Sequence, residues 1–182
     1  MQSVTKFVAG VCALALSSVL GCGTTDVVMD PQTPPTSGRV DIEAWLSAGL
    51  YKSWKSEAAV HASRSPSPHG QNRIFSNTLL SAAGAGEYPV GAASVKELYN
   101  DAGTQLNGYA VFLHTKAGKT GDTWYFYERV PLDHPAPHDT YGVVADGAGS
   151  AGPANTICVG CHQAAGSDAA HSGHDFVYTQ VK

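Results

Sequence analysis

The chain has 182 residues, and 43% of them are hydrophobic, which is enough for one domain with a packed core. Its formal net charge is −4. Removal of an N-terminal leader containing Lys6 leaves ten basic residues against fifteen acidic ones. Because no basic run offsets this balance, the composition excludes a surface that attracts nucleic acid by charge.

The first residues have the pattern of an export signal. Lys6 precedes an uncharged run over 7–20, which is too short to span a bilayer comfortably. The run leads into Gly21 and Cys22, and this ending resembles a bacterial lipobox, in which the cysteine becomes the lipid-bearing N-terminus. We predict a lipoprotein signal peptide over 1–21, a lipid on Cys22 and anchoring on the periplasmic side of a bacterial membrane, with the outer membrane favoured. The alternative is an ordinary signal peptide followed by a chance cysteine.

The composition after Cys22 divides the mature chain into two parts. A polar, proline-rich stretch predicts a lipidated tether over 22–39, and the remainder, 40–182, is expected to fold as one domain. At the start of that domain, Asp41 can cap a helix whose apolar residues recur at three- and four-residue steps as far as Ser56.

Strand patterns dominate the middle of the domain. Runs rich in aromatic and β-branched residues predict a short strand over 73–77 and an antiparallel meander over 90–99, 108–115 and 122–130. Residues rich in Pro, His, Asp, Gly and Ala over 131–154 indicate a long connection. A short helix is expected from Asn155 and a last strand over 175–180. The expected fold class is therefore α+β, a mainly antiparallel sheet with an N-terminal helix and a short helix near the C-terminus.

The cysteines carry the most specific motif. Cys12 leaves with the leader and Cys22 takes the lipid, so only Cys158 and Cys161 remain for the domain, and a disulfide framework is excluded. Cys158-Val-Gly-Cys161-His162 is the signature for covalent haem attachment. On one helical turn the two thiols can meet the two vinyl groups of a porphyrin edge, and His162 can ligate the iron. The motif predicts one covalently bound haem c.

Two other interpretations use the same cysteines. Together with His171 and His174 they could bind zinc tetrahedrally, although this leaves His162 unexplained. They could also remain without metal or form a disulfide pair.

The second axial position decides between an electron carrier and a reactive iron. The methionines are Met1, in the leader, and Met29, in the tether, which makes methionine ligation improbable. A second histidine, a lysine or an open position remains. Five of the seven other histidines lie in predicted loops, where solvated imidazoles are expected. The seven are His61, His69, His114, His134, His138, His171 and His174.

Several stretches in a fixed order resemble the cytochrome P-460 family and its gas-binding relatives, the cytochromes c′-beta. They are His69-Gly with Arg73 and Asn77, Tyr88 to Glu97, Gly108-Tyr-Ala-Val, Trp124 to Glu128, the Cys158 to His162 motif, and Asp175-Phe-Val-Tyr-Thr. The resemblance implies an antiparallel sheet with flanking helices, a high-spin haem with His162 proximal, and an open distal face. It also implies either oxidation of hydroxylamine or binding of nitric oxide or carbon monoxide.

The resemblance further implies roles for individual residues. In the name-giving enzymes a lysine is crosslinked to the porphyrin, and Lys96 is the residue that matches, although it could instead point outward and pair with Glu97. Catalysis requires a carboxylate near the distal iron. The segment before Cys158 contains no acid, so Glu128 or Asp146 would have to supply it. In a gas binder, aromatic residues would cap the iron instead.

Candidates for that cap are Phe75, Phe112 and Phe126, although core packing is the favoured role for each of them. The implied partners are a small-molecule or gas ligand, a periplasmic redox partner, the membrane through the lipid alone, and a second copy of the chain as a homodimer. The principal alternative from another class is a bis-histidine cytochrome that only transfers electrons, followed by a zinc-binding module.

Overall fold

The computed structural model describes residues 32–65 and 67–182. The predicted signal peptide, the lipidation site Cys22 and Met29 lie outside these residues. Within them, no helix has both the length and the apolar character needed to cross a bilayer.

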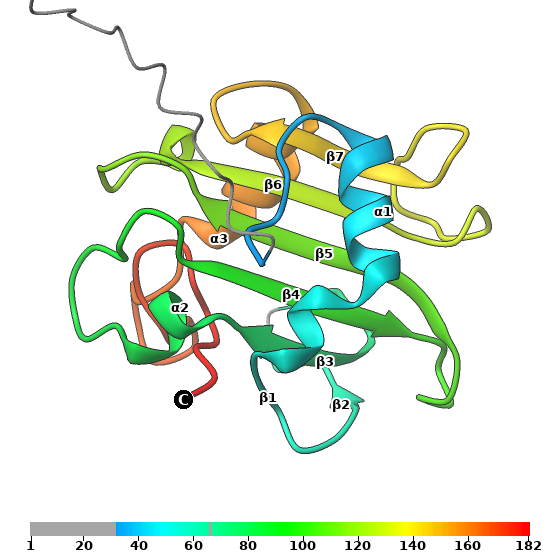
Figure 1. Cartoon of the computed structure of the whole chain (residues 1–182), viewed down its shortest axis with the longest axis horizontal. Helices are drawn as coiled ribbons and strands as arrows, with labels where there is room; N and C mark the ends of the chain where they lie inside the picture. Colours follow the sequence, from blue (N-terminus) through cyan, green and yellow to red (C-terminus); the bar gives the residue numbers. More distant parts are fainter. Residues whose placement is uncertain (1–31, 66) are drawn as a thin grey trace, which may run out of the picture.

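The described chain is built on one antiparallel sheet (Figure 1). Its strand order is β1-β3-β4-β5-β6-β7, with β2 paired to β3 at the edge. The strands are β1 (Lys55–Ser56), β2 (His61–Ala62), β3 (Gln71–Ser76), β4 (Ala93–Tyr99), β5 (Leu106–His114), β6 (Trp124–Arg129) and β7 (Val143–Ala148). Each pair of neighbours is antiparallel, so connected strands run as hairpins from β3 to β7.

The helices of the described residues are few and short. They are α1 (Arg39–Ala48), the 3-10 turns η1 (Leu50–Ser53) and η2 (Gly121–Thr123), α2 (Thr78–Ala82), the π-helical η3 (Ala154–Val159) and α3 (Gly160–His162). The predicted α+β class is therefore wrong: this is a mainly β structure in which seven antiparallel strands form the one large layer. The helical patterns in the sequence correspond to segments too short to form a layer of their own.

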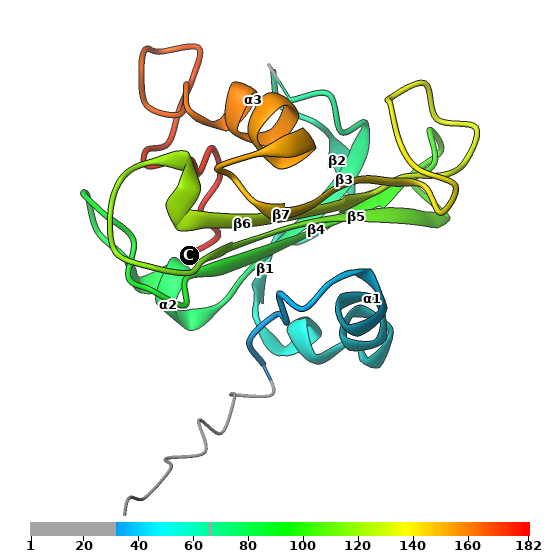
Figure 2. The same ribbon diagram turned by 90° about the horizontal axis from the view of Figure 1, so that it is seen from above.

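Helix α1 covers one face of the sheet (Figure 2). Ile42, Trp45 and Leu46 are buried against it, as the apolar spacing indicated. The helix is shorter than predicted because Gly49 adopts a left-handed conformation, with φ of 68°, which ends it before η1. Its N-cap is Gly38 rather than Asp41. The core on this side consists of Ile42, Trp45, Leu46, Tyr51, Trp54, Phe75, Ala93, Val95, Val111, Leu113, Tyr125 and Tyr127.

The opposite face of the sheet carries η3, α3 and part of the C-terminal segment (Figure 2). Here Trp124 and Phe126 of β6 pack with Val159 of η3 and with Val177. Period-two geometry explains the division, because Trp124 and Phe126 point to this face while Tyr125 and Tyr127 point to α1.

Two expectations about the C-terminal third are wrong. Residues 131–154 are not one long connection, since β7 lies within them and pairs with β6. Its sequence is rich in small residues, so its strand state depends on pairing with β6 more than on intrinsic preference. Residues 175–180 form no strand, and the pairing there is a single bridge between His174 and Val177.

Candidate functional site

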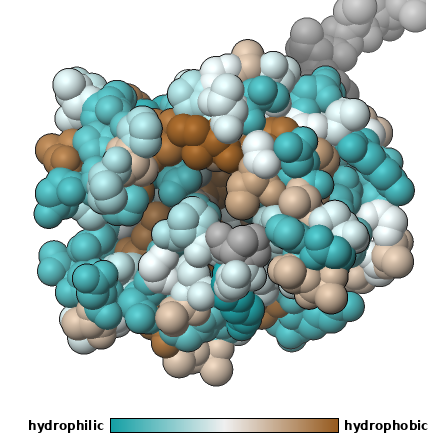
Figure 3. Space-filling model, turned by 180° about the vertical axis from the view of Figure 1, so that it is seen from behind, coloured by the Kyte–Doolittle hydropathy of each residue, from teal (hydrophilic) through white to brown (hydrophobic). Residues whose placement is uncertain are grey.

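A cavity of about 610 Å³ opens between the η3–α3 helical segment and the sheet. Figure 3 shows the hollow on this side of the molecule, with apolar surface visible beside hydrophilic groups. The three residues of the predicted attachment motif, Cys158, Cys161 and His162, line it from the helical side. Strands β4, β5 and β6 form its floor, and residues 63–65, 67–70 and 133–136 contribute to its rim.

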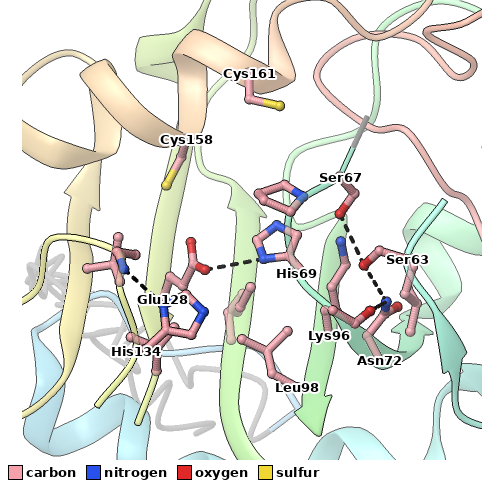
Figure 4. Close-up of a pocket in the computed structure, with 18 of the residues that line it drawn as sticks. Ser63, Ser67, His69, Asn72, Lys96, Leu98, Glu128, His134, Cys158 and Cys161 are labelled. Atoms are coloured by element: carbon pink, nitrogen blue, oxygen red, sulfur yellow. Dashed lines mark hydrogen bonds and ion pairs between the residues drawn. The ribbon is translucent and has the colours of Figure 1, made fainter. Parts of the chain in front are cut away.

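The attachment motif spans the junction of η3 and α3. The wider π-helical turn ends at Val159, and α3 continues it to His162 without a break. Both cysteines are free thiols; Cys158 is buried and Cys161 is partly exposed. Burial raises the pKa of Cys158 to about 12. In Figure 4 both cysteines lie on the helical side of the cavity, across from His69, Lys96 and Glu128.

The imidazole of His162 is held in one orientation. Its Nδ1 donates a hydrogen bond of 2.6 Å to the carbonyl of Phe176, and its ring makes edge contacts with Phe112 and Phe126 at 5.8 and 5.6 Å between centroids. Burial lowers its pKa to about 4. A neutral imidazole that donates from Nδ1 carries its lone pair on Nε2, which is the arrangement of a metal-ligating histidine with an outer hydrogen-bond partner.

A tight turn in the C-terminal segment positions the carbonyl of Phe176, which accepts the hydrogen bond from His162. Asp175 and Phe176 both have positive φ, 44° and 67°, a conformation that is uncommon outside glycine. The Asp175 carboxylate accepts a hydrogen bond of 2.9 Å from the backbone N–H of Tyr88, which ties the turn to the sheet side of the molecule. Tyr178 then donates to the carbonyl of Cys161 at 3.0 Å. The segment thus holds the motif in place, and Tyr178 also lines the cavity.

Two rows of side chains cross the cavity floor. Strand register places Ser94, Phe112 and Phe126 in one row, and Lys96, Ala110 and Glu128 in the next. Same-face residues of a strand are about 6.7 Å apart. The His162 ring packs on the phenylalanines of the first row, whereas the charged groups belong to the second, where the small side chain of Ala110 leaves space between them.

The second row carries a largely buried contact between an imidazole and a carboxylate. His69, from the loop before β3, lies with its Nδ1 3.2 Å from Oε1 of Glu128, and the two side chains are only 11% and 13% exposed. Burial would raise the pKa of Glu128, but the hydrogen bond from His69 and the charges of His69 and Lys96 outweigh it and hold the pKa below its ordinary value. Burial lowers the pKa of His69. The pair therefore favours an ionised Glu128 beside a neutral His69.

Lys96 lines the same cavity. Within the described chain its ammonium has no hydrogen bond or ion pair, and Figure 4 shows its side chain beside His69. Burial lowers the pKa of Lys96 to about 8, although the carboxylates of Glu128 and Glu57 oppose the shift. The amine therefore faces the cavity and not solvent.

The structure separates the other predicted site residues. Phe112 and Phe126 line the cavity with Glu128 and Lys96. Phe75 does not, because it pairs with Val95 and so faces α1, where its ring contacts Tyr51 at 5.1 Å. Asp146 is also on the α1 face, since it pairs with Tyr127, and it accepts a hydrogen bond from Tyr125. Neither residue can serve in this cavity.

His69 is the residue that sequence reasoning missed, since it was expected to be a solvated loop imidazole. No periodic pattern reaches the loop before β3, and its position follows only from the fold. His134 also lines the cavity, at its rim. The remaining histidines lie elsewhere: His61 pairs with Glu57, His114 is buried against Trp124, His138 bonds to the carbonyl of Asp139, His171 pairs with Asp168, and His174 stacks on Tyr88.

The zinc hypothesis receives no support from these positions. Among residues 32–65 and 67–182, no group of three or more His, Cys, Asp and Glu side chains is placed to hold a metal ion. His174 stacks on Tyr88 with 4.5 Å between ring centroids, and His171 is turned to Asp168.

Comparison with known proteins identifies no relative: no protein-family model, no curated protein and no solved structure matches the chain.

Proposed function

We propose that the chain is an exported, lipid-anchored c-type cytochrome with one haem, which handles small nitrogen species at an open iron as proteins of the cytochrome P-460 type do. The observation that carries the proposal is the position of the Cys158 to His162 motif at the wall of a cavity of about 610 Å³. Membrane attachment through Cys22 belongs to the same proposal and depends on the lipobox pattern in the sequence.

The residues present fit a haem. Cys158 and Cys161 would supply the two sulfurs. His162 can offer Nε2 to the iron because its Nδ1–H donates a hydrogen bond to the carbonyl of Phe176. Phe112 and Phe126 supply apolar surface. When bound, the haem would supply an iron that binds small ligands and exchanges single electrons. The cavity volume of about 610 Å³ lies within the range that is usual for small-molecule binding sites. Like such sites, the cavity is lined by both apolar and polar groups.

Within this site different side chains have different roles. Phe112 and Phe126 hold the His162 ring in place, whereas His69 and Glu128 provide the polar contacts for a bound substrate. An imidazole and a carboxylate can together donate to and accept from hydroxylamine, whereas nitric oxide, which has no hydrogen, can only accept a hydrogen bond from the imidazole. Whether the molecule is turned over or only bound depends on Lys96, which the resemblance identifies as the residue for a crosslink.

Carbon monoxide tests the open iron. We expect the reduced holoprotein to bind the gas rapidly, with a shift of its main visible absorption band, because no side chain would occupy the second axial position. A bis-histidine electron carrier would bind carbon monoxide slowly or not at all, because a histidine would already occupy the second axial position. His69 and His134 are the histidines besides His162 that line the cavity and could do so. Slow or absent binding by wild type, restored in His69→Ala or His134→Ala, would contradict the proposal and favour the electron carrier.

Lys96 provides a second prediction. Its side chain lines the same cavity as Cys158 and Cys161, so a haem attached to these cysteines would lie beside it. We expect denaturing mass spectrometry of digested holoprotein to recover the Lys96 peptide joined to the haem peptide. Lys96→Arg keeps the charge and should release that peptide while both thioether bonds remain. A free Lys96 peptide in wild type would favour a gas-binding protein over a hydroxylamine oxidase.

A further inference from the structure

We propose that His69, held by Glu128, is the group that accepts a proton from a weakly acidic ligand bound in the cavity. The inference rests on the proposed function and adds to it the residue that takes the proton and the class of ligand, small neutral acids of the form HX that bind as X⁻. On this assignment Glu128 is a positioning residue, not itself the proton acceptor.

The geometry of the pair supports this division of roles. Glu128 Oε1 lies 3.2 Å from Nδ1 of His69, and the negative charge of the carboxylate at this distance favours a proton on Nδ1, which leaves the lone pair on Nε2. Nε2 has no partner among the described residues, and His69 lines the cavity. A carboxylate that holds an imidazole in one tautomer is a common way to prepare a general base.

The position of the pair relative to His162 also fits. His162 contacts Phe112 and Phe126, whereas Glu128 lies one same-face step farther along β6, beside Ala110. The predicted iron ligand and the predicted base therefore meet the cavity at different rows of the floor. A molecule bound in the cavity can contact His69 without displacing His162.

The proton step balances without any change in oxidation state. The H–X bond breaks, its electron pair stays on X, and the proton moves to Nε2 of His69. The Nδ1–H remains hydrogen-bonded to Glu128, whose negative charge stabilises the imidazolium that forms. Burial disfavours a charged His69 before the ligand enters, so the imidazole is available as an acceptor.

Two test ligands distinguish a loss of proton transfer from a loss of access to the cavity. Hydrogen cyanide must lose its proton to bind as cyanide to the oxidised holoprotein, whereas carbon monoxide binds the reduced holoprotein without losing one. We expect His69→Gln, which keeps an N–H donor for Glu128 but has no basic nitrogen, to slow cyanide association by about a hundredfold and to leave carbon monoxide association within about twofold of wild type. Stopped-flow absorbance measures both rates.

Glu128→Gln should slow cyanide association in part, since the imidazole loses its anionic support, and Glu128→Asp should recover some of that loss. The matched control is His138→Gln, which removes an imidazole that bonds to the carbonyl of Asp139 and does not line the cavity, and it should change neither rate. Unchanged cyanide association in His69→Gln overturns the inference, and equal slowing of both ligands assigns His69 a steric role and overturns it too. A wild type without haem would instead refute the proposed function.

Discussion

The double variant Cys158→Ala/Cys161→Ala, produced in a cell with c-type cytochrome assembly machinery, should carry no covalently bound haem. The two thiols are free and lie at the cavity wall, and no other cysteine of the described chain can replace them. Wild-type protein should keep its colour after denaturation and gain the mass of one haem, whereas the double variant should lose both properties. Denaturing electrophoresis with a haem stain, together with intact-protein mass spectrometry, measures the difference.

The matched control for this experiment addresses the zinc hypothesis. His171→Ala removes one of the two histidines which that hypothesis requires, but it lies outside the Cys158 to His162 motif, and so the haem should remain. Each single cysteine variant should retain one thioether bond and a shifted absorption band. Colourless wild-type protein that contains stoichiometric zinc would contradict the haem assignment.

Gly108→Ala should destabilise the sheet that carries the site. A Cβ at Gly108 would lie 2.2 Å from the carbonyl oxygen of Arg129 and 3.3 Å from Cα of Val130, both of which are backbone atoms. Relief requires β5 and β6 to separate where their pairing sets Ala110 opposite Glu128. We expect the free energy of unfolding to fall by about 3 kcal/mol, measured by denaturant titration.

Gly84→Ala is the control for this substitution. A methyl group at Gly84 would have no atom within 4 Å, and the backbone there has no positive φ, so the change to alanine should alter the unfolding free energy by less than about 0.5 kcal/mol. Similar values for the two variants would show that β5 and β6 can adjust at Gly108. Carbon monoxide association in Gly108→Ala reports whether the second row of the floor moves with the strands.

The strands with strong patterns could be predicted from sequence, and those that depend on pairing could not. β3 to β6 were expected near their observed positions because Val, Tyr, Phe and Trp concentrate there. β7 contains Val143 and Val144 followed by small and polar residues, and its strand state depends on hydrogen bonds to β6. The α1 helix was expected to be longer because its apolar spacing continues beyond Gly49, where the backbone turns left-handed.

The same distinction holds for the candidate site. Cys158, Cys161 and His162 could be identified because their spacing within one short segment is a local property of the chain. Phe75 could not be assigned a face, because the face depends on register with β4, where Phe75 pairs with Val95 and not with Lys96.

Two further positions needed the tertiary structure. Asp146 was a candidate only while β7 was unrecognised, and its pairing with Tyr127 takes it to the α1 face. His69 comes from a loop whose path no periodicity determines, and it enters the site only when the loop closes over β6.

The turn at Asp175 and Phe176 bears on the order in which the attachment motif and the C-terminal segment fold. The carbonyl that orients His162 belongs to residues that follow the attachment motif, and Gln180 fastens them by donating to the carbonyls of Leu80 and Ala83 at 2.6 and 2.7 Å. During synthesis the motif emerges before Gln180 does. If the chain is the c-type cytochrome proposed above, its thiols would be accessible to attachment enzymes before Gln180 packs against Leu80 and Ala83, and that packing would follow haem attachment as the last step of maturation.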